Sequence, residues 1–146
     1  MGIVASLGIA LLVFTTVIHY EVLRMLSAGL PALRIPGRAK LVVIIFSAFI
    51  AHIVEIFLYA VAFHVLVQYF GVGALGQAGD ASLTLCFYFS AETYTSLGYG
   101  DVVPSGDLRL LAGMEALNGL LLIGWSASYT FIAMERFWKD NGHSKR

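Results

Sequence analysis

The chain has 146 residues, of which 59% are apolar and 12% are charged, whereas a soluble domain carries about 25% charged residues. Its nine basic and nine acidic side chains cancel, which leaves no basic field that would hold nucleic acid. The single cysteine, Cys86, excludes an internal disulfide framework and a cysteine-rich metal site. This composition is typical of a membrane protein and argues against a soluble secreted protein, a DNA-binding domain and a disordered linker.

Three apolar stretches are long enough to cross a bilayer, which takes about 20 helical residues. The first covers residues 1–28 and lacks the charged start and the cleavage site of a signal peptide. It is apolar on every face between Ile3 and Ile18, so spanning is favoured over lying flat in the interface. The second stretch covers residues 41–70 and the third covers residues 108–138. The sequence therefore predicts three transmembrane helices.

Positive charge predicts the orientation of these helices. Residues 29–40, between the first two stretches, form a proline- and glycine-containing loop rich in arginine and lysine, and residues 139–146 form a basic tail. Residues 71–107 contain three aspartates and no basic residue. By the positive-inside rule, the loop and the tail are cytoplasmic, and residues 71–107 and the N-terminus face the other side. We expect a multi-pass protein of a plasma (inner) membrane, with an extracellular or periplasmic N-terminus.

Residues 82–95 read as a moderately apolar helix that is too short to cross the membrane, because about 14 residues span only ~20 Å. The string Ser96-Leu97-Gly98-Tyr99-Gly100-Asp101 follows it directly, and Pro104 comes soon after. A short helix that enters the membrane and returns on the same side forms a re-entrant loop, which is tolerated only when it is buried in protein or lines water.

This string, placed between a short aromatic helix and an apolar run, closely resembles the selectivity filter of tetrameric potassium channels. The resemblance covers about residues 80–138. It implies a pore domain at 41–138, with an outer helix at 41–70, a turret at 71–81, a pore helix at 82–95, a filter at 96–101 and an inner helix at 108–138. It also implies an all-α homotetramer in the lipid bilayer that conducts potassium, is not an enzyme, and uses no organic cofactor or nucleic acid. A regulatory partner is left open.

The resemblance implies that the carbonyl groups of Ser96, Leu97, Gly98 and Tyr99 bind dehydrated potassium ions. It also implies that the Ser96 hydroxyl completes the innermost site and that Gly100 ends the ion-binding segment. The carbonyls can all point to one side only if the backbone alternates between left- and right-handed conformations, which Gly98 and Gly100 adopt without penalty. The family usually has Thr-Val in place of Ser96-Leu97. We expect the filter still to prefer potassium after this change, but with a less strict selectivity. A weakly selective cation channel is therefore the alternative.

Five residues are expected to support the filter: Tyr88, Phe89, Glu92, Thr95 and Asp101. For Glu92 there are two interpretations. It shares a proton with Asp101 behind the filter, where two like charges force one pKa upward, or it accepts hydrogen bonds from backbone N–H groups near the filter. Tyr88 and Phe89 occupy the positions of the family's aromatic cuff, where Phe89 is unable to donate a hydrogen bond toward Tyr99.

The inner helix contains candidate hinge and cavity residues. Counting from Pro104, Gly119 lies within a residue of the family's hinge glycine. A glycine in a transmembrane helix serves equally to allow close packing, and both roles remain open for Gly119 and Gly124. Glu115 and Asn118 lie on one face of the helix, and we expect Glu115 to pack onto the pore helix. Helical spacing places a further set toward the cavity: Leu121, Gly124, Ser128 and Ile132.

Two other patterns in the sequence are typical of different functions and are weighed beside the channel interpretation. Residues 71–76 match G-x-G-x-x-G but follow a transmembrane helix instead of a strand, so they are expected to form the turret. His52, Glu55 and Tyr59 form a polar stripe on the second run, which we interpret as hydrogen-bonded to the first helix or the pore helix. A metal site of an intramembrane metalloenzyme is the lesser alternative for this stripe. For the function of the whole chain, a non-conducting regulatory subunit is a further alternative.

Overall fold

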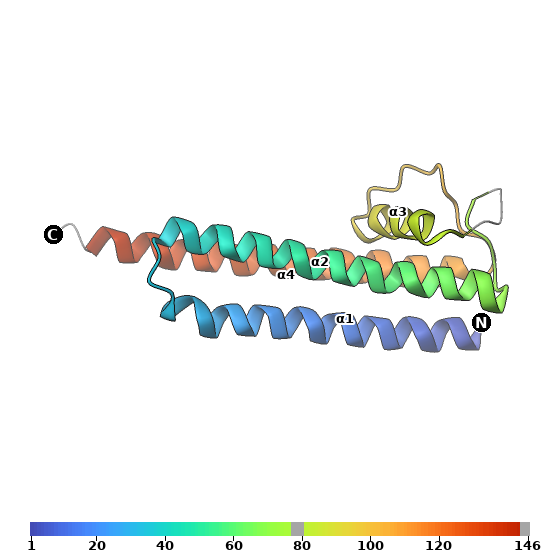
Figure 1. Ribbon diagram of the computed structural model, residues 1–146, viewed down its shortest axis with the longest axis horizontal. Coiled ribbons are helices and arrows are strands. Elements are labelled where there is room, and N and C mark those ends of the chain that lie inside the picture. The colour runs from blue at the N-terminus through green and yellow to red at the C-terminus, as the bar shows by residue number, and fades with distance from the viewer. Residues whose placement is uncertain (77–80, 144–146) are drawn as a thin grey trace.

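The structure is a computed structural model that describes residues 1–76 and 81–143, with the side chains of 1–76 and 81–136. Three long helices lie lengthwise beside one another, and a short helix lies at one end of them (Figure 1). The four α-helices are α1 (Gly2–Gly29), α2 (Gly37–Val65), α3 (Leu83–Tyr94) and α4 (Leu108–His143). The predicted all-α class is confirmed.

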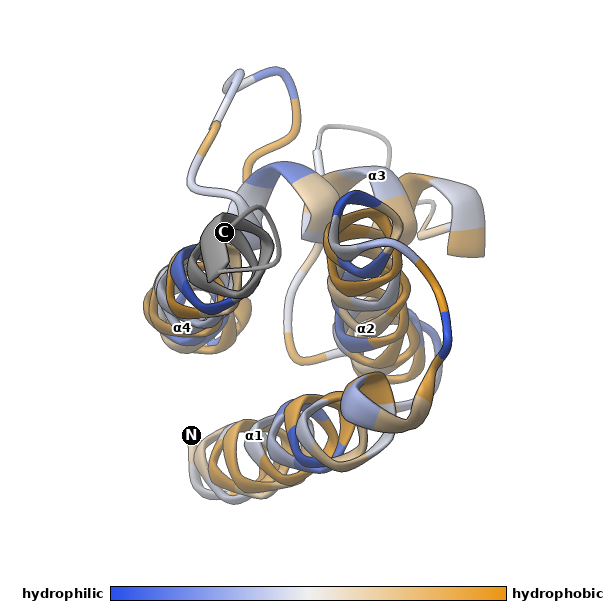
Figure 2. Cartoon of the chain, turned by 90° about the vertical axis from the view of Figure 1, so that its left-hand side faces the viewer, coloured by the Kyte–Doolittle hydropathy of each residue, from blue (hydrophilic) through white to orange (hydrophobic). Residues whose placement is uncertain are grey.

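Three segments are long and apolar enough to cross a membrane: Gly2–Ala32, Gly37–Phe70 and Leu108–Arg136. Hydrophobic residues, in orange, recur along the three long helices (Figure 2). On α2, for example, Phe46 is 66% exposed and Phe49 is 63% exposed. Exposed aromatic side chains of this size are costly in water and favourable in lipid. The three predicted transmembrane helices are therefore confirmed in length and composition.

The ends of the chain lie at opposite ends of the bundle (Figure 1). The N-terminus lies at the end that carries α3, where the amino group of Met1 pairs with the carboxylate of Asp107. The C-terminus lies at the other end, together with the α1–α2 connection. Residues 71–107 and the N-terminus thus share one end of the molecule, as the charge distribution predicts.

The helix boundaries differ from the sequence prediction around the first connection. α1 runs to Gly29, a short 3₁₀-helix covers Leu30–Ala32, and α2 begins at Gly37 instead of residue 41. Pro31 stands in the first turn of the 3₁₀-helix and Pro36 is the N-cap of α2. Proline is tolerated at such positions because its missing N–H would have no helical partner there. Most of the predicted loop 29–40 is therefore helical.

The predicted inner helix and tail also shift. The backbone of α4 continues to His143, so part of the predicted tail 139–146 is helical, while residues 144–146 lie outside the described residues.

The C-terminal end of α2 continues into a π-helical turn, Leu66–Phe70. This turn stops at Gly71, which has a left-handed φ of 58°. This conformation is open to glycine without a side-chain penalty.

The turret is attached to the segment that follows the filter. The N–H of Ser105 donates to the Ala74 carbonyl at 2.9 Å, and Leu75 and Pro104 form an antiparallel bridge. A Cβ added to Gly73 would lie 2.3 Å from the Ser105 carbonyl oxygen, so this glycine permits a close backbone approach. The G-x-G-x-x-G pattern thus packs against the segment after the filter, and residues 77–80 of the predicted turret lie outside the described residues.

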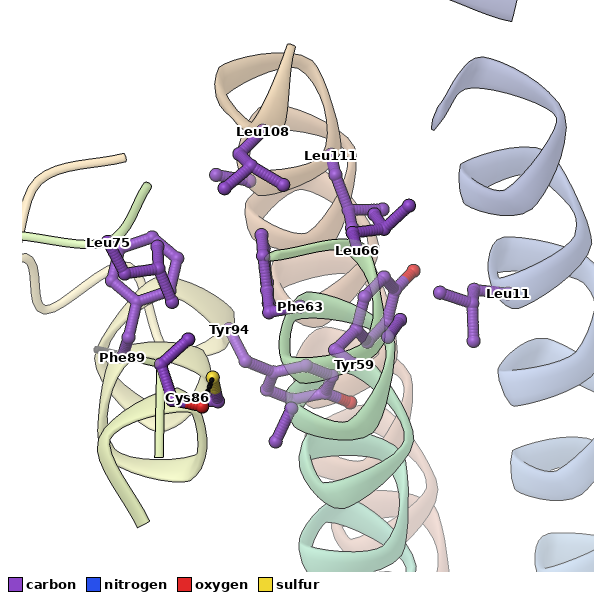
Figure 3. Packing of buried hydrophobic residues seen from close by; sticks show 14 of the residues in the cluster. Leu11, Tyr59, Phe63, Leu66, Leu75, Cys86, Phe89, Tyr94, Leu108 and Leu111 are labelled. Carbon is purple, nitrogen blue, oxygen red and sulfur yellow. Dashed lines mark hydrogen bonds between the residues drawn. The ribbon is translucent and has the colours of Figure 1, made fainter. Parts of the chain in front are cut away.

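The apolar core lies at the end of the bundle where α3 packs against α2 and α4, and α1 adds side chains from the far side of these two helices (Figure 3). Phe63 of α2 packs edge-to-face against Phe89 of α3, with ring centroids 5.1 Å apart. Further buried side chains come from every helix, and they include Leu11, Tyr59, Cys86, Tyr94, Leu108 and Leu111. This shared core fixes the short helix, and therefore the segment after it, relative to the bundle.

Candidate ion-conduction site

The site begins with α3, which has 12 residues and is therefore about 18 Å long. The Ser82 hydroxyl caps its first turn by accepting from the Leu85 N–H at 3.2 Å. Thr95 is its C-cap. The helix is too short to cross a membrane, and the chain after it turns back toward the same end of the bundle (Figure 1). α3 and residues 96–107 thus have the form of a re-entrant loop.

The backbone after α3 alternates in handedness. Ser96, Gly98 and Gly100 have φ angles of 57°, 55° and 79°. The two glycines adopt the left-handed conformation expected of them, and Ser96 adopts it without being a glycine, which is uncommon. Left-handed residues at every second position allow successive carbonyl groups to face the same side of the segment. This is the backbone geometry that a carbonyl-lined ion path requires.

Glu92 holds this segment in place. Its carbonyl oxygen accepts from the N–H of Leu97 at 2.9 Å and from that of Gly98 at 3.3 Å. Its side-chain Oε2 accepts from the N–H of Tyr99 at 3.2 Å. Of the two interpretations offered for Glu92, the structure has the second, in which the carboxylate binds a backbone N–H beside the filter. The side chain is only 4% exposed.

Asp101 has a different partner. Its Oδ2 accepts from the Tyr88 hydroxyl at 2.9 Å, and its Oδ1 accepts from the Val102 N–H at 3.1 Å. The hydrogen bond to Asp101 raises the pKa of Tyr88 to about 12. The hydrogen bonds of the described residues do not join Glu92 to Asp101 directly. Of the two residues expected in the cuff, Tyr88 is hydrogen-bonded to Asp101, whereas Phe89 packs against Phe63.

One side of the filter segment is unsupported within a single chain. Leu97 is 58% exposed and Tyr99 is 70% exposed, although both follow a helix with a well-buried core. Four cavity candidates on α4 are exposed as well: Leu121, Gly124, Ser128 and Ile132. These surfaces are available to line a pore or to contact other subunits.

The inner helix contacts α3 closely. Glu115 is fully buried and shares a hydrogen bond with the Ser90 hydroxyl, which confirms that it packs onto the pore helix. A Cβ added to Gly119 would lie 2.1 Å from the carbonyl oxygen of Tyr94. This observation favours the packing role of Gly119 over the hinge role. At Gly124 an added Cβ would meet nothing within 4 Å.

The polar stripe of α2 is hydrogen-bonded to the three other helices, as interpreted. His52 Nδ1 lies 3.0 Å from the Tyr94 hydroxyl of α3, and Glu55 Oε1 lies 2.9 Å from His19 Nδ1 of α1. The Tyr59 hydroxyl accepts from the Asn118 amide of α4 at 3.2 Å. The hydrogen bonds of His19 were not predicted from the sequence. Their only signal was a histidine within an otherwise apolar run.

Comparison with known proteins identifies the family of the chain. The family described as "Ion channel" matches residues 39–136, which include the outer helix, the short helix, the filter segment and most of the inner helix. The chain belongs to this ion channel family. The expected membership in the potassium-channel pore-domain class is thereby confirmed.

A curated relative is the "Inward rectifier potassium channel Kirbac3.1" of Paramagnetospirillum magnetotacticum. It is 36% identical over 61 residues, which make up 41% of this chain and 21% of the relative. The match thus covers about a fifth of that protein's length. No solved structure matches the chain.

Proposed function

We propose that the protein is the subunit of a homotetrameric potassium channel, in which dehydrated potassium ions pass along the backbone carbonyls of Ser96, Leu97, Gly98 and Tyr99. The observation that carries the proposal is the alternating left-handed backbone at residues 96, 98 and 100, in a segment braced by a buried carboxylate. A ring of carbonyl oxygens replaces the hydration shell of the ion. One chain supplies one strand of such a ring, so four copies are required.

The exposed surfaces agree with this assembly. Leu97 and Tyr99 of the filter segment and Leu121 and Ile132 of α4 are each more than half exposed in the single chain. In a tetramer, the filter strands would face the central axis, and the exposed face of α4 would line the cavity or contact a neighbouring inner helix. The C-terminal end of α3, with its partial negative charge, would favour a cation near the axis.

We place the C-terminal end in the cytoplasm. Arg34, Arg38 and Arg136 belong to the α1–α2 connection, the start of α2 and the last part of α4, which lie at the end of the bundle opposite α3 (Figure 1). Positive side chains flanking membrane helices favour the cytoplasmic side. The filter and the N-terminus then face the outside of a plasma membrane.

The experiment is the reversal potential of the purified protein in planar bilayers, with potassium on one side and sodium on the other. A reversal potential near the potassium equilibrium potential, with block by barium, is the expected result. A reversal potential near zero would favour a weakly selective cation channel, in keeping with the Ser96-Leu97 pair. A tetramer that conducts neither ion under any condition would favour a regulatory subunit.

A matched pair of variants distinguishes a specific effect on the filter from the general effect of backbone strain. Gly98 and Gly71 both have a left-handed φ, of 55° and 58°, and both have space for a Cβ. Gly98→Ala and Gly71→Ala therefore introduce the same backbone penalty, of about 1–2 kcal/mol. We expect Gly98→Ala to lose conduction or selectivity and Gly71→Ala to keep both. Equal effects of the two variants would argue against residues 96–100 as the ion path.

A further inference from the structure

A cluster of two imidazoles and one carboxylate lies inside the bundle, away from the filter. His19 of α1 and Glu55 of α2 are fully buried, and His52 of α2 is partly buried, with an 18% exposed side chain. One donor atom from each of these three side chains lies within 4.8 Å of the other two. We propose that His19, His52 and Glu55 form a binding site for a divalent transition-metal ion of the zinc class.

The distances fit such an ion with small movements. His19 Nδ1 lies 2.9 Å from Glu55 Oε1, and His52 Nδ1 lies 3.1 Å from Glu55 Oε2. Around tetrahedral zinc, with bonds of about 2.0–2.1 Å, neighbouring ligand atoms are about 3.4 Å apart. The carboxylate therefore already lies at about ligand distance from both imidazoles, through one oxygen to each, and the three ligand atoms lie within 4.8 Å of one another. The centroids of the two imidazole rings are 5.1 Å apart.

The donor set is the one that this class of metal prefers. Two imidazole nitrogens with one carboxylate oxygen match the His₂Glu sets of zinc sites, which leave a fourth position open. The Tyr94 hydroxyl is the nearest further oxygen, because it is hydrogen-bonded to both His52 and Glu55. A water molecule or this hydroxyl would complete the coordination.

A second group of atoms orients the first ligand. His19 Nε2 lies 3.0 Å from the Ser126 hydroxyl of α4. When Nδ1 binds the metal, the ring hydrogen is on Nε2 and the serine oxygen accepts it, so a neutral imidazole ligates without releasing a proton. Metal-binding histidines usually have such a partner on the other nitrogen, and it fixes the tautomer and the ring orientation.

The site has a route of entry. A cavity of about 360 Å³ lies between α2 and α4 below the end of α3, and His52, Tyr94 and Ser126 are among its lining residues. His52 is also the least buried of the three ligands. The cavity therefore gives the cluster an opening at His52.

The position of the site suggests an effect on conduction, and this part rests on the proposed function. Tyr94 is the last residue of α3, and the filter segment follows it after Thr95. A metal ion that takes the Glu55 carboxylate or the Tyr94 hydroxyl as a ligand would alter the hydrogen bonds that fix the end of the pore helix. We infer that occupancy of the site changes the open probability of the filter.

The binding test needs no ion flux. Chelator-stripped, tag-free protein in detergent is titrated with Zn²⁺ by equilibrium dialysis, and with Co²⁺ to follow the visible absorption of a tetrahedral site. His143 is replaced by asparagine in every sample, because a histidine near the chain end could bind metal on its own. We expect one ion per chain and a tetrahedral Co²⁺ spectrum.

The ligand variants are His19→Asn and His52→Asn, since the asparagine amide mimics the position of Nδ1. Each is expected to weaken zinc binding by about tenfold or more. His64→Asn is the matched control, because His64 is also on α2 but has its Nδ1 2.7 Å from the Ala81 carbonyl oxygen instead. His52→Cys, which restores a zinc ligand without restoring the imidazole hydrogen bonds, is expected to regain binding if His52→Asn lost it.

Three results would overturn the proposal: no stoichiometric binding by the parent protein, unchanged binding in both ligand variants, or an equal loss in His64→Asn. Size-exclusion chromatography identifies variants that fail to fold. If a ligand variant fails to fold, Zn²⁺ binding by His52→Cys decides whether the cluster is the metal site. Potassium flux with and without Zn²⁺ is measured separately. Stoichiometric Zn²⁺ binding without potassium flux would support the metal site and refute the proposed channel function. A potassium flux that bound Zn²⁺ does not change would refute the effect of the metal on conduction.

Discussion

The side-chain amide of Asn118 on α4 donates a hydrogen bond of 2.7 Å to the hydroxyl of Thr15 on α1. The same amide nitrogen lies 3.2 Å from the Tyr59 hydroxyl of α2, so one side chain joins the three long helices. Asn118 and Thr15 are almost completely buried. This contact places the additional N-terminal helix on its own subunit, beside both the outer and the inner helix.

Replacing Asn118 by alanine is expected to destabilise the fold by about 1–3 kcal/mol, because it leaves the buried Thr15 and Tyr59 hydroxyls without this partner. The measurement is the free energy of unfolding of the protein in detergent. Ser6→Ala on α1 is the control, since the Ser6 hydroxyl is exposed and bonds only to its own helix, at Ile3. If both variants unfold alike, the polar contact does not hold α1 in place.

The hydrogen bond between Tyr88 and Asp101 predicts the alkaline behaviour of the cuff. The pKa of Tyr88 is raised to about 12, above the ordinary value of about 10. A raised pKa means that the folded protein favours the protonated phenol. Its contribution to stability is therefore complete below pH ~10 and is lost as the pH rises through about 12.

The check is the phenolate absorbance during an alkaline titration of the parent protein minus that of Tyr88→Phe. The difference is expected to titrate near pH 12, and near pH 10 when the same subtraction is made in an Asp101→Asn background. A difference curve centred near 10 in the parent would mean that Tyr88 does not donate to Asp101 in solution.

The sequence predicted the elements and indicated that the polar stripe of α2 is hydrogen-bonded to other helices, but it did not predict which side chains are the partners. Length and hydropathy alone determine the three long helices, and the spacing of Gly98 and Gly100 indicated the left-handed positions. The left-handed Ser96 was not predicted, because local propensity disfavours this conformation for a serine. The contacts that hold it are local: the Leu97 N–H donates to the Glu92 carbonyl five residues before it, as at helix C-termini that end in a left-handed residue. The link between His19 and Glu55 crosses 36 positions, and helical periodicity gives no information on which faces of two helices meet.

Glu92 provides a direct test of the filter brace. Glu92→Ala removes the acceptor of the Tyr99 N–H, a hydrogen bond to a charged group that is worth about 1.5–3 kcal/mol. We expect the potassium current of this variant to decay faster or to be absent, while the tetramer still assembles. Glu92→Gln keeps an oxygen at the same position, so its current is expected to stay close to that of the parent protein.

Similar effects of Glu92→Gln and Glu92→Ala on the current would favour the other interpretation of Glu92. A proton shared with Asp101 requires a carboxyl group, so Glu92→Gln would then impair the current almost as much as Glu92→Ala. Single-channel recordings at constant potassium concentration distinguish a change in open probability from a change in conductance. Size-exclusion chromatography shows whether each variant is still assembled.

Gly119 and Gly124 separate close packing from hinge bending on the inner helix. A methyl group at Gly119 would overlap the carbonyl oxygen of Tyr94, at 2.1 Å, whereas the same group at Gly124 meets nothing within 4 Å of its own chain. Overpacking of this kind costs about 1–3 kcal/mol or more. Because a backbone atom is in the way, side-chain rotation does not relieve it. We expect Gly119→Ala to lower the unfolding temperature and the yield of assembled protein, and Gly124→Ala to leave both unchanged. If Gly119→Ala assembled normally and altered only the opening of the pore, the glycine would be a hinge and the close contact with Tyr94 would have to relax in the assembled channel.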